Sequence, residues 1–359
     1  MTVTPCPAAL PPPPDVIRAG YAELIVTDLD AARWFYVDVL GLVVTAEDAD
    51  ALYLRAFEEY LHHSLVLRRG VTPALGRLAY RVRGQAQVDA AERYYRALGV
   101  DTRRVPAGTT RGIGEAVRIT DPLGFPVEFY YDAEHTERLT QRYDLHPSNA
   151  ITRLDHFNVM VPDVAAAHAY YTGLGFGVSE TIEDERHNIY AAWLYRKQTV
   201  HDIALTSGDG PRLHHIAFAT AERHHILHTC VVLGALRKER HIERGPGRHG
   251  VSNAFYLYVR DPDGHRIEIY TTDYYTGDPD NPTVRWNVDD NRRRSFWGHS
   301  VVPSWYTEGS PVLGPDGGPT PLTAATVREA DRGVLVGADG FSQVTEGGAP
   351  TGFKLGTQV

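Results

Sequence analysis

The chain has 359 residues, of which 43% are hydrophobic, enough for two domains with cores of ordinary size. Its net charge of −9 and its lack of a basic block argue against a nucleic-acid partner. Its two cysteines exclude a disulfide framework, and no apolar run approaches the ~20 residues of a membrane span, so we expect a cytoplasmic protein without membrane contact. Residues 1–15 include four consecutive prolines and are predicted to form a flexible arm.

The first predicted domain, residues 16–145, begins with an alternating strand that ends at Asp28. This aspartate is a suitable N-cap for the helix that follows, and Gly41 marks the end of that helix. Further strands reach about residue 67. A second strand over 78–82 then leads into a helix over about 88–98. The last strands are joined by an Asp-Pro-Leu-Gly turn at residues 121–124.

The second predicted domain, residues 146–285, repeats this order of signals. Asp163, Gly175 and the Asp-Pro-Asp-Gly turn at 261–264 each follow their first-half counterparts by roughly 135–140 residues. We interpret the repeat as a duplication. Each domain then contains two βαβββ units, and the fold class is α+β with four such modules paired into two domains. Residues 286–359 break the pattern and are predicted to be a C-terminal extension that covers the active site.

Three candidate metal ligands occupy corresponding strands of the second domain. They are His156, His215 and Glu268, and the first domain has Tyr21, Arg77 and Glu128 at the matching positions. Arginine keeps its proton and repels a cation, so only the second domain is predicted to bind the metal. Two imidazoles and one carboxylate form the facial set of non-haem Fe(II) oxygenases, although zinc also accepts these ligands.

The neighbouring His214 has a different interpretation. Side chains alternate along a strand, so His214 is predicted to face away from His215 and to be a hydrogen-bonded core residue. A buried carboxylate such as Glu268, between Ile267 and Ile269, is costly without a partner, which favours a ligand role for it.

Longer segments of the chain resemble a known family. Residues 57–63, 245–258, 267–270, 273–282 and 302–308 are similar to type I extradiol catechol dioxygenases of the vicinal oxygen chelate superfamily. Within that family they most resemble the enzymes that act on homoprotocatechuate, 3,4-dihydroxyphenylacetate. The resemblance extends from about residue 14 to about residue 310.

The resemblance implies roles for further residues. His201 matches the family's acid/base residue, and an imidazole suits proton transfer near neutral pH. Tyr258 would donate a hydrogen bond to the reacting oxygen, Asn158 would lie near the metal, and Trp193 would form a wall beside the ring. The predicted carboxylate-binding group comprises Arg244, His249 and Arg293, with Arg294 beside it.

The resemblance therefore implies extradiol cleavage of 3,4-dihydroxyphenylacetate by O2 to 5-carboxymethyl-2-hydroxymuconate semialdehyde. It also implies Fe(II), with Mn(II) as a second choice, and a homotetramer. Three alternatives remain open from the sequence. They are an extradiol dioxygenase for another carboxylated catechol such as protocatechuate, a metal-dependent isomerase or lyase of the same fold, and a non-catalytic binding protein.

Overall fold

Four βαβββ units follow one another in the computed structural model, which describes residues 10–146, 149 and 151–329. The first unit comprises β1 (Val16–Val26), α1 (Leu29–Arg33) with its π-helical continuation η1 (Trp34–Val39), β2 (Val43–Glu47), β3 (Ala51–Arg55) and β4 (Leu65–Arg69). The second comprises β5 (Ala74–Val82), α2 (Gln85–Ala97), β6 (Thr102–Val105), β7 (Ala116–Thr120) and β8 (Pro126–Tyr130). The α+β class and the modular order predicted from the repeat are confirmed for the first half.

The second half repeats the order after a short 3-10 turn, η2 (Tyr143–Leu145). The third unit comprises β9 (Ile151–Val161), α3 (Val164–Gly173), β10 (Gly177–Glu183), β11 (Ile189–Tyr195) and β12 (Ile203–Ser207). The fourth comprises β13 (Arg212–Thr220), α4 (Arg223–Ala235), η3 (Glu239–His241), β14 (Ile242–Arg248), η4 (Val251–Asn253), β15 (Phe255–Arg260) and β16 (Arg266–Thr271).

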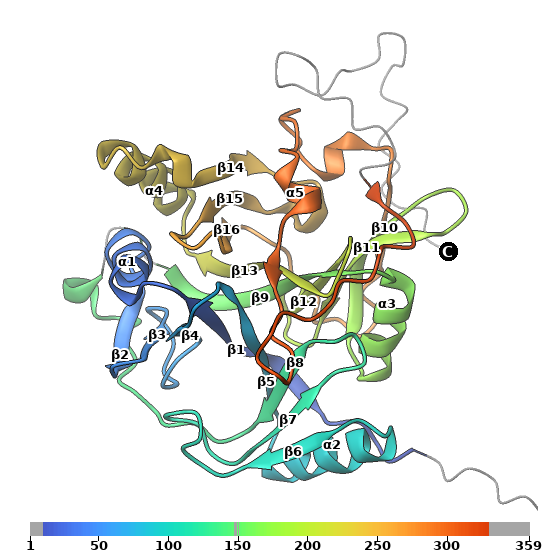
Figure 1. Cartoon of the computed structure of the whole chain (residues 1–359). Helices are drawn as coiled ribbons and strands as arrows, with labels where there is room; N and C mark the ends of the chain where they lie inside the picture. Colours follow the sequence, from blue (N-terminus) through green and yellow to red (C-terminus); the bar gives the residue numbers. More distant parts are fainter. Residues whose placement is uncertain (1–9, 147–148, 150, 330–359) are drawn as a thin grey trace, which may run out of the picture.

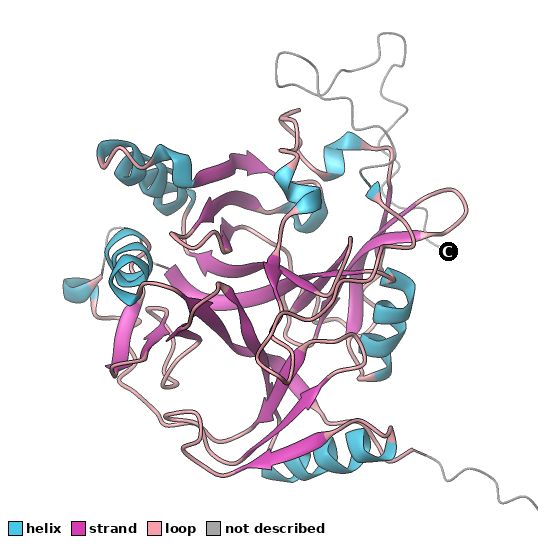
Figure 2. Ribbon diagram, in the orientation of Figure 1, coloured by secondary structure: helices cyan, strands magenta, loops and turns pink. Residues whose placement is uncertain are grey.

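Each half forms its own sheet. The strand order is β2-β3-β4-β1-β5-β8-β7-β6 in the first half and β14-β15-β16-β13-β9-β12-β11-β10-β17 in the second. In both, the first strands of the two units pair antiparallel at the centre, β1 with β5 and β9 with β13. The strands occupy the interior and the helices the periphery (Figure 2).

The local signals read from the sequence have their predicted structures. The Asp28 carboxylate accepts from the backbone N–H groups of Asp30 and Ala31, and Asp163 caps α3 through Ala166 N. Gly124 and Gly264, in the two Asp-Pro-x-Gly turns, have φ of +90° and +88°, a conformation that glycine adopts without strain.

The two halves share one hydrophobic core cluster, and β1 and β9 run beside each other in Figure 1. Polar contacts also join the halves. The Asp202 carboxylate accepts from Ala19 N at 2.8 Å, and His265 Nε2 donates to Ile25 O at 2.9 Å. The second-half sheet is therefore held rigidly against the first.

The C-terminal extension packs on both halves. β17 (Val284–Asn287) pairs parallel with β10, and η5 (Asn291–Arg293) and α5 (Ser304–Thr307) follow it. β18 (Ser310–Pro311) pairs with β13, and Val312 then bridges to Leu75 of the first half. Residues 1–9 of the predicted arm and 330–359 of the predicted extension lie outside the described residues. In the part that is described, none of the helices is both long and apolar enough to span a lipid bilayer.

Candidate active site

The three predicted metal ligands converge in the second half. His156 on β9, His215 on β13 and Glu268 on β16 come from three adjacent strands, and Ala217 lies opposite both His156 and Glu268 in the register. Glu268 Oε2 lies 3.2 Å from His156 Nε2 and 3.2 Å from His215 Nε2, and the two Nε2 atoms are 3.4 Å apart. All three side chains are buried.

This spacing fits a metal ion. Ligand atoms about 2.1 Å from a metal, at right angles to one another, lie about 3.0 Å apart, close to the separations observed. Two imidazoles and a carboxylate arranged in this way form one face of an octahedron. The donor set suits Fe(II) or Mn(II), and a metal held in this way would keep its remaining positions open to other ligands.

His156 is held by a buried carboxylate on its other ring nitrogen. Asp155 Oδ2 lies 2.9 Å from His156 Nδ1, and this contact leaves the Nε2 lone pair directed at Glu268 and His215. Burial raises the pKa of Asp155, but Lys197, His156 and Arg153 outweigh it and hold the pKa far below the ordinary value. Lys197 Nζ is 3.6 Å from Asp155 Oδ1, and this ammonium argues against a second cation between Asp155, His156 and His201.

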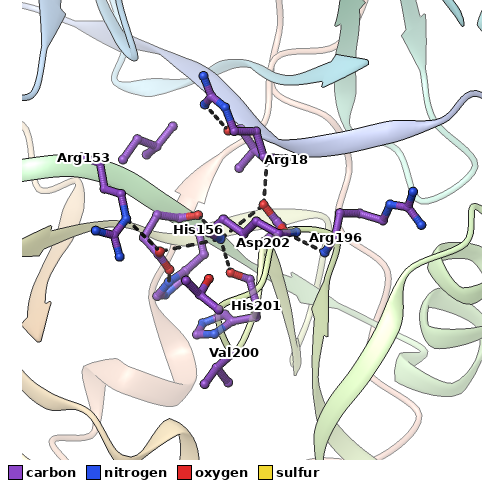
Figure 3. A network of polar contacts seen from close by, with 12 residues as sticks. Arg18, Arg153, His156, Arg196, Val200, His201 and Asp202 are labelled. Carbon is purple, nitrogen blue, oxygen red and sulfur yellow. Dashed lines mark hydrogen bonds and ion pairs between the residues drawn. The ribbon is translucent and has the colours of Figure 1, made fainter. Parts of the chain in front are cut away.

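Lys197 links Asp155, His201 and Asp202 in one polar network, of which Figure 3 shows His156, His201 and Asp202 among its labelled residues. Its Nζ donates to Asp155 O at 2.7 Å, to Asp202 Oδ1 at 3.2 Å and to the carbonyl oxygen of His201. Asp202 in turn accepts from the backbone N–H of Arg196 at 2.6 Å. The network fixes the chain on both sides of His201 to the strand that carries His156.

His215 is supported by His214, contrary to the prediction that His214 faces away. A β-bulge between Leu213 and His215 inserts one extra residue opposite β9 and turns the two imidazoles toward each other, with Nδ1 atoms 2.7 Å apart. His214 Nε2 donates to Trp305 O at 3.0 Å, so its Nδ1 accepts from His215 Nδ1. His215 is thereby held in the tautomer whose Nε2 can bind a metal.

Burial and charge set the protonation of the ligands. Burial lowers the pKa of His215 to about 4, which keeps its imidazole neutral. Burial also lowers the pKa of His156, but Asp155 and Glu268 raise it above the ordinary value. Burial raises the pKa of Glu268, but the adjacent His156 and His215 outweigh burial and hold the pKa well below its ordinary value, so the carboxylate is ionised.

The corresponding place in the first half is filled by protein groups. Glu128 accepts from the Tyr21 hydroxyl at 2.6 Å and from Arg118 Nε at 2.6 Å. Arg77 occupies the position that corresponds to His215 in the other half. It is more distant, at 3.9 Å from Glu128, because it also pairs with Glu23 at 3.5 Å. A guanidinium bound to the carboxylate supports the expectation that this half holds no metal.

His201 lies against the metal-ligand cluster. Its ring centroid is 3.7 Å from that of His156, and its Nδ1 has no hydrogen-bond partner among the described residues. Burial, with the neighbouring His156, keeps the pKa of His201 well below the ordinary value, so the imidazole is neutral. A neutral ring with an unused nitrogen can accept a proton from a bound hydroxyl group.

Tyr258 and His249 form a second hydrogen-bonded chain. His249 Nδ1 donates to Arg294 O at 2.6 Å, so its Nε2 accepts from the Tyr258 hydroxyl at 3.0 Å. Tyr258 lies opposite Glu268 in the β15–β16 register. Burial and Glu268 raise the pKa of Tyr258 well above 10, and the hydroxyl therefore remains a donor.

Two predicted residues line the pocket from neighbouring strands. Asn158 lies two residues after His156 on β9, and its Oδ1 accepts from the Thr206 hydroxyl at 2.9 Å. Trp193, on β11, packs against a small hydrophobic cluster that includes Val251, and it lines the same pocket. Both side chains therefore line the same pocket as the candidate metal ligands.

Three arginines gather at one part of the pocket. Arg244 Nη2 donates to Arg294 O at 2.9 Å, and its guanidinium lies 4.3 Å from the centre of the Trp305 ring. Arg293 is 1% exposed, and its Nη1 donates to Glu329 Oε1 at 2.8 Å. Arg294 Nε donates to the same oxygen at 2.6 Å. These cations can bind an anionic substituent of a substrate.

A single pocket is lined by all eleven residues predicted from the sequence. They are His156, Asn158, Trp193, His201, His215, Arg244, His249, Tyr258, Glu268, Arg293 and Arg294. Sequence reasoning missed Asp155, Lys197, His214, Trp305 and Glu329. An aspartate directly before His156 in an apolar strand was a usable signal for the first of these, whereas contacts of the extension leave no local pattern.

Comparison with known proteins agrees with this geometry. Residues 153–269 match the Glyoxalase/Bleomycin resistance protein/Dioxygenase superfamily, and residues 76–135 match the catechol 2,3-dioxygenase-like N-terminal domain. A manganese-dependent 2,3-dihydroxybiphenyl 1,2-dioxygenase of Geobacillus genomosp. 3 is 30% identical over 300 residues, which cover 79% of this chain and 94% of that protein.

Solved structures extend the likeness. Homoprotocatechuate 2,3-dioxygenase of Arthrobacter globiformis is 61% identical with a TM-score of 0.86, over 87% of this chain and 97% of that one. The Brevibacterium fuscum enzyme in complex with 3,4-dihydroxyphenylacetate is 58% identical with a TM-score of 0.87, over 88% of this chain and 99% of that one. The chain therefore belongs to the extradiol catechol dioxygenases, oxidoreductases of the Glyoxalase/Bleomycin resistance protein/Dioxygenase superfamily.

Proposed function

We propose that the protein cleaves the ring of 3,4-dihydroxyphenylacetate beside its two hydroxyl groups and inserts both atoms of O2. The product is 5-carboxymethyl-2-hydroxymuconate semialdehyde. One observation carries the choice of substrate: Arg244, Arg293 and Arg294 line the same pocket as His156, His215 and Glu268. A ring that carries a carboxylate on a short arm satisfies both groups at once.

The residues of the pocket have distinct roles in this reaction. His156, His215 and Glu268 hold the metal, with Fe(II) as the first choice and Mn(II) as the second, and the metal supplies Lewis-acid and one-electron chemistry between catechol and dioxygen. His201 takes the proton of a substrate hydroxyl on its free Nδ1 and returns it to the reacting oxygen.

Other side chains position the reactants and exclude water. The Tyr258 hydroxyl gives up its hydrogen bond to His249 Nε2 and donates to the reacting oxygen instead. Asn158 and Trp193 form walls beside the substrate ring. Arg244, His249 and Arg293 bind the carboxylate, with Arg294 beside them. The extension covers the pocket with Trp305 and Glu329. The same proposal includes a homotetrameric assembly and a cytoplasmic location.

Substrate preference tests the proposal. Wild type and Arg293→Ala would be assayed by O2 uptake and by the yellow product, with 3,4-dihydroxyphenylacetate and with uncharged 4-ethylcatechol. Loss of a charge-assisted contact of about 1.5–3 kcal/mol is expected to lower kcat/KM for the acid by about tenfold to a hundredfold and to leave 4-ethylcatechol almost unchanged. Arg292→Ala, whose side chain pairs with Asp290, is the matched control. An unchanged preference in Arg293→Ala would contradict the assignment.

A further inference from the structure

The arginines predicted to bind the substrate carboxylate already bind a carboxylate of the protein. Glu329 Oε1 accepts from Arg293 Nη1 at 2.8 Å, from Arg294 Nε at 2.6 Å and from the Tyr306 hydroxyl at 3.1 Å. Glu329 lines the pocket and is only 7% exposed. It therefore offers these arginines the same chemical group as the substrate.

Arg293 needs such a partner at every stage of the reaction. Its guanidinium is 1% exposed, and a buried charge that loses its counter-ion destabilises the protein strongly. Burial raises the pKa of Glu329, but Arg293 and Arg294 outweigh it and lower the pKa to about 2, so the group is a carboxylate at neutral pH. A substrate carboxylate can replace Glu329 without leaving Arg293 unpaired.

Glu329 also occupies the part of the pocket that the acidic arm needs. Its side chain lines the same pocket as the candidate metal ligands, and its Oε1 accepts hydrogen bonds from Arg293 and Arg294. A substrate carboxylate that binds the same N–H donors must therefore take the place of the Glu329 carboxylate.

Hydrogen bonds hold the chain before Glu329 in place, including one from Arg328, the residue directly before it, to Asp209. Thr323 N donates to Gly210 O at 2.7 Å, and Thr326 N donates to Pro162 O at 2.8 Å. These backbone bonds hold the segment on the second half. The Glu329 side chain can therefore leave the arginines by rotation about its own bonds while the backbone before it stays in place, and it remains close enough to return.

We propose that Glu329 is a built-in competitor of the substrate carboxylate. It holds Arg293 and Arg294 before substrate binds, yields them to a carboxylated catechol, and takes them back when the product leaves. The inference rests on the proposed function. Glu329 thus raises the KM for carboxylated catechols and speeds release of a product that keeps the acidic arm, whereas plain catechol, which has no arm, does not displace it.

Steady-state kinetics of Glu329→Gln in the metal-loaded, full-length enzyme tests this competition. The KM for 3,4-dihydroxyphenylacetate is expected to fall about tenfold, inhibition by product to tighten by a similar factor, and the KM for plain catechol to stay within about twofold. Asp316→Asn, which removes an exposed carboxylate of the same extension, is the matched control and should change none of these values.

Two further outcomes decide between explanations. Tyr306→Phe keeps Glu329 but removes one of its three hydrogen bonds, so it should shift the KM in the same direction by about twofold to threefold, even if Glu329→Gln does not fold. The inference would be overturned if the KM for the acid were unchanged or higher in folded Glu329→Gln, because Glu329 would then only order the arginines. If Glu329→Gln does not fold, the same result in Tyr306→Phe would overturn it. Wild-type enzyme that cleaves plain catechol but not 3,4-dihydroxyphenylacetate would contradict the proposed function itself.

Discussion

Asp155→Asn removes the charge behind one metal ligand and nearly keeps the shape of the side chain. Asp155 Oδ2 lies 2.9 Å from His156 Nδ1, and the side chain is fully buried. The Asp155 carboxylate fixes the tautomer of His156 and raises its basicity. The substitution weakens this contact and therefore weakens both effects. Lys197 keeps its bond to Asp202 at 3.2 Å, so its ammonium does not become unpaired.

The magnitude follows from the type of contact. A charge-assisted hydrogen bond contributes about 1.5–3 kcal/mol, and loss of a carboxylate behind a metal-bound histidine commonly costs tenfold to a hundredfold in metal affinity or activity. These ranges agree, since each 1.4 kcal/mol corresponds to about tenfold. We expect the metal dissociation constant of Asp155→Asn to rise by about tenfold to a hundredfold.

Competition with a chelator measures this constant for Fe(II) and Mn(II), with activity per bound metal recorded alongside. Asp273→Asn is the matched control, because Asp273 is a neighbouring carboxyl that accepts from the backbone N–H of Val200 instead of from a histidine. The control should bind metal as wild type does. Wild-type affinity in Asp155→Asn would refute the reasoning that Asp155 prepares His156 as a ligand.

Three further predictions concern the histidine that orients His215, the effect of metal removal on thermal stability, and the pH dependence of stability. His214→Leu removes the acceptor of His215 Nδ1 and should weaken metal binding about tenfold in the same competition assay; unchanged affinity would contradict the tautomer assignment. Removal of the metal by a chelator should lower Tm by several degrees, since a ligand at a hundred times its Kd adds about 2.7 kcal/mol, and Mn(II) should restore it. Burial raises the pKa of Glu180 to about 7, so its protonated form stabilises the folded state below pH 4.5 and this contribution is lost as the pH rises through 7. The free-energy difference between wild type and Glu180→Gln in denaturant unfolding should therefore change by about 3 kcal/mol over that range, and a constant difference would contradict the burial of this carboxyl.

The duplication explains why so much of the fold could be predicted. Because the same pattern occurs twice, the helix and strand boundaries in one half indicate those in the other. Helix caps such as Asp28 and Asp163 depend only on neighbouring residues, so they can be predicted directly from the sequence. The metal ligands were visible for a related reason. A histidine or glutamate in an apolar strand is costly unless it has a function, and the first half showed what the same positions contain without one.

The site residues that were not predicted depend on geometry that the alternation of side chains along a strand does not encode. His214 was assigned to the wrong face because a single-residue bulge reorients it. Lys197 and Glu329 act through contacts between segments, and Glu329 reaches Arg293 across 36 positions of chain. Arg118, rather than Arg77, is the main partner of Glu128, because Arg118 lies directly opposite Glu128 in the β7–β8 register.

Isotope labelling of the product tests the central claim most directly. Metal-loaded protein would be given 3,4-dihydroxyphenylacetate under 18O2, and the product would be reduced at once to prevent exchange of its aldehyde oxygen with water. A ring-opened product that carries both labelled oxygen atoms is the predicted result, and metal-free protein should form none. A product with an intact ring, or one with a single labelled atom, would contradict extradiol cleavage at the site of His156, His215 and Glu268.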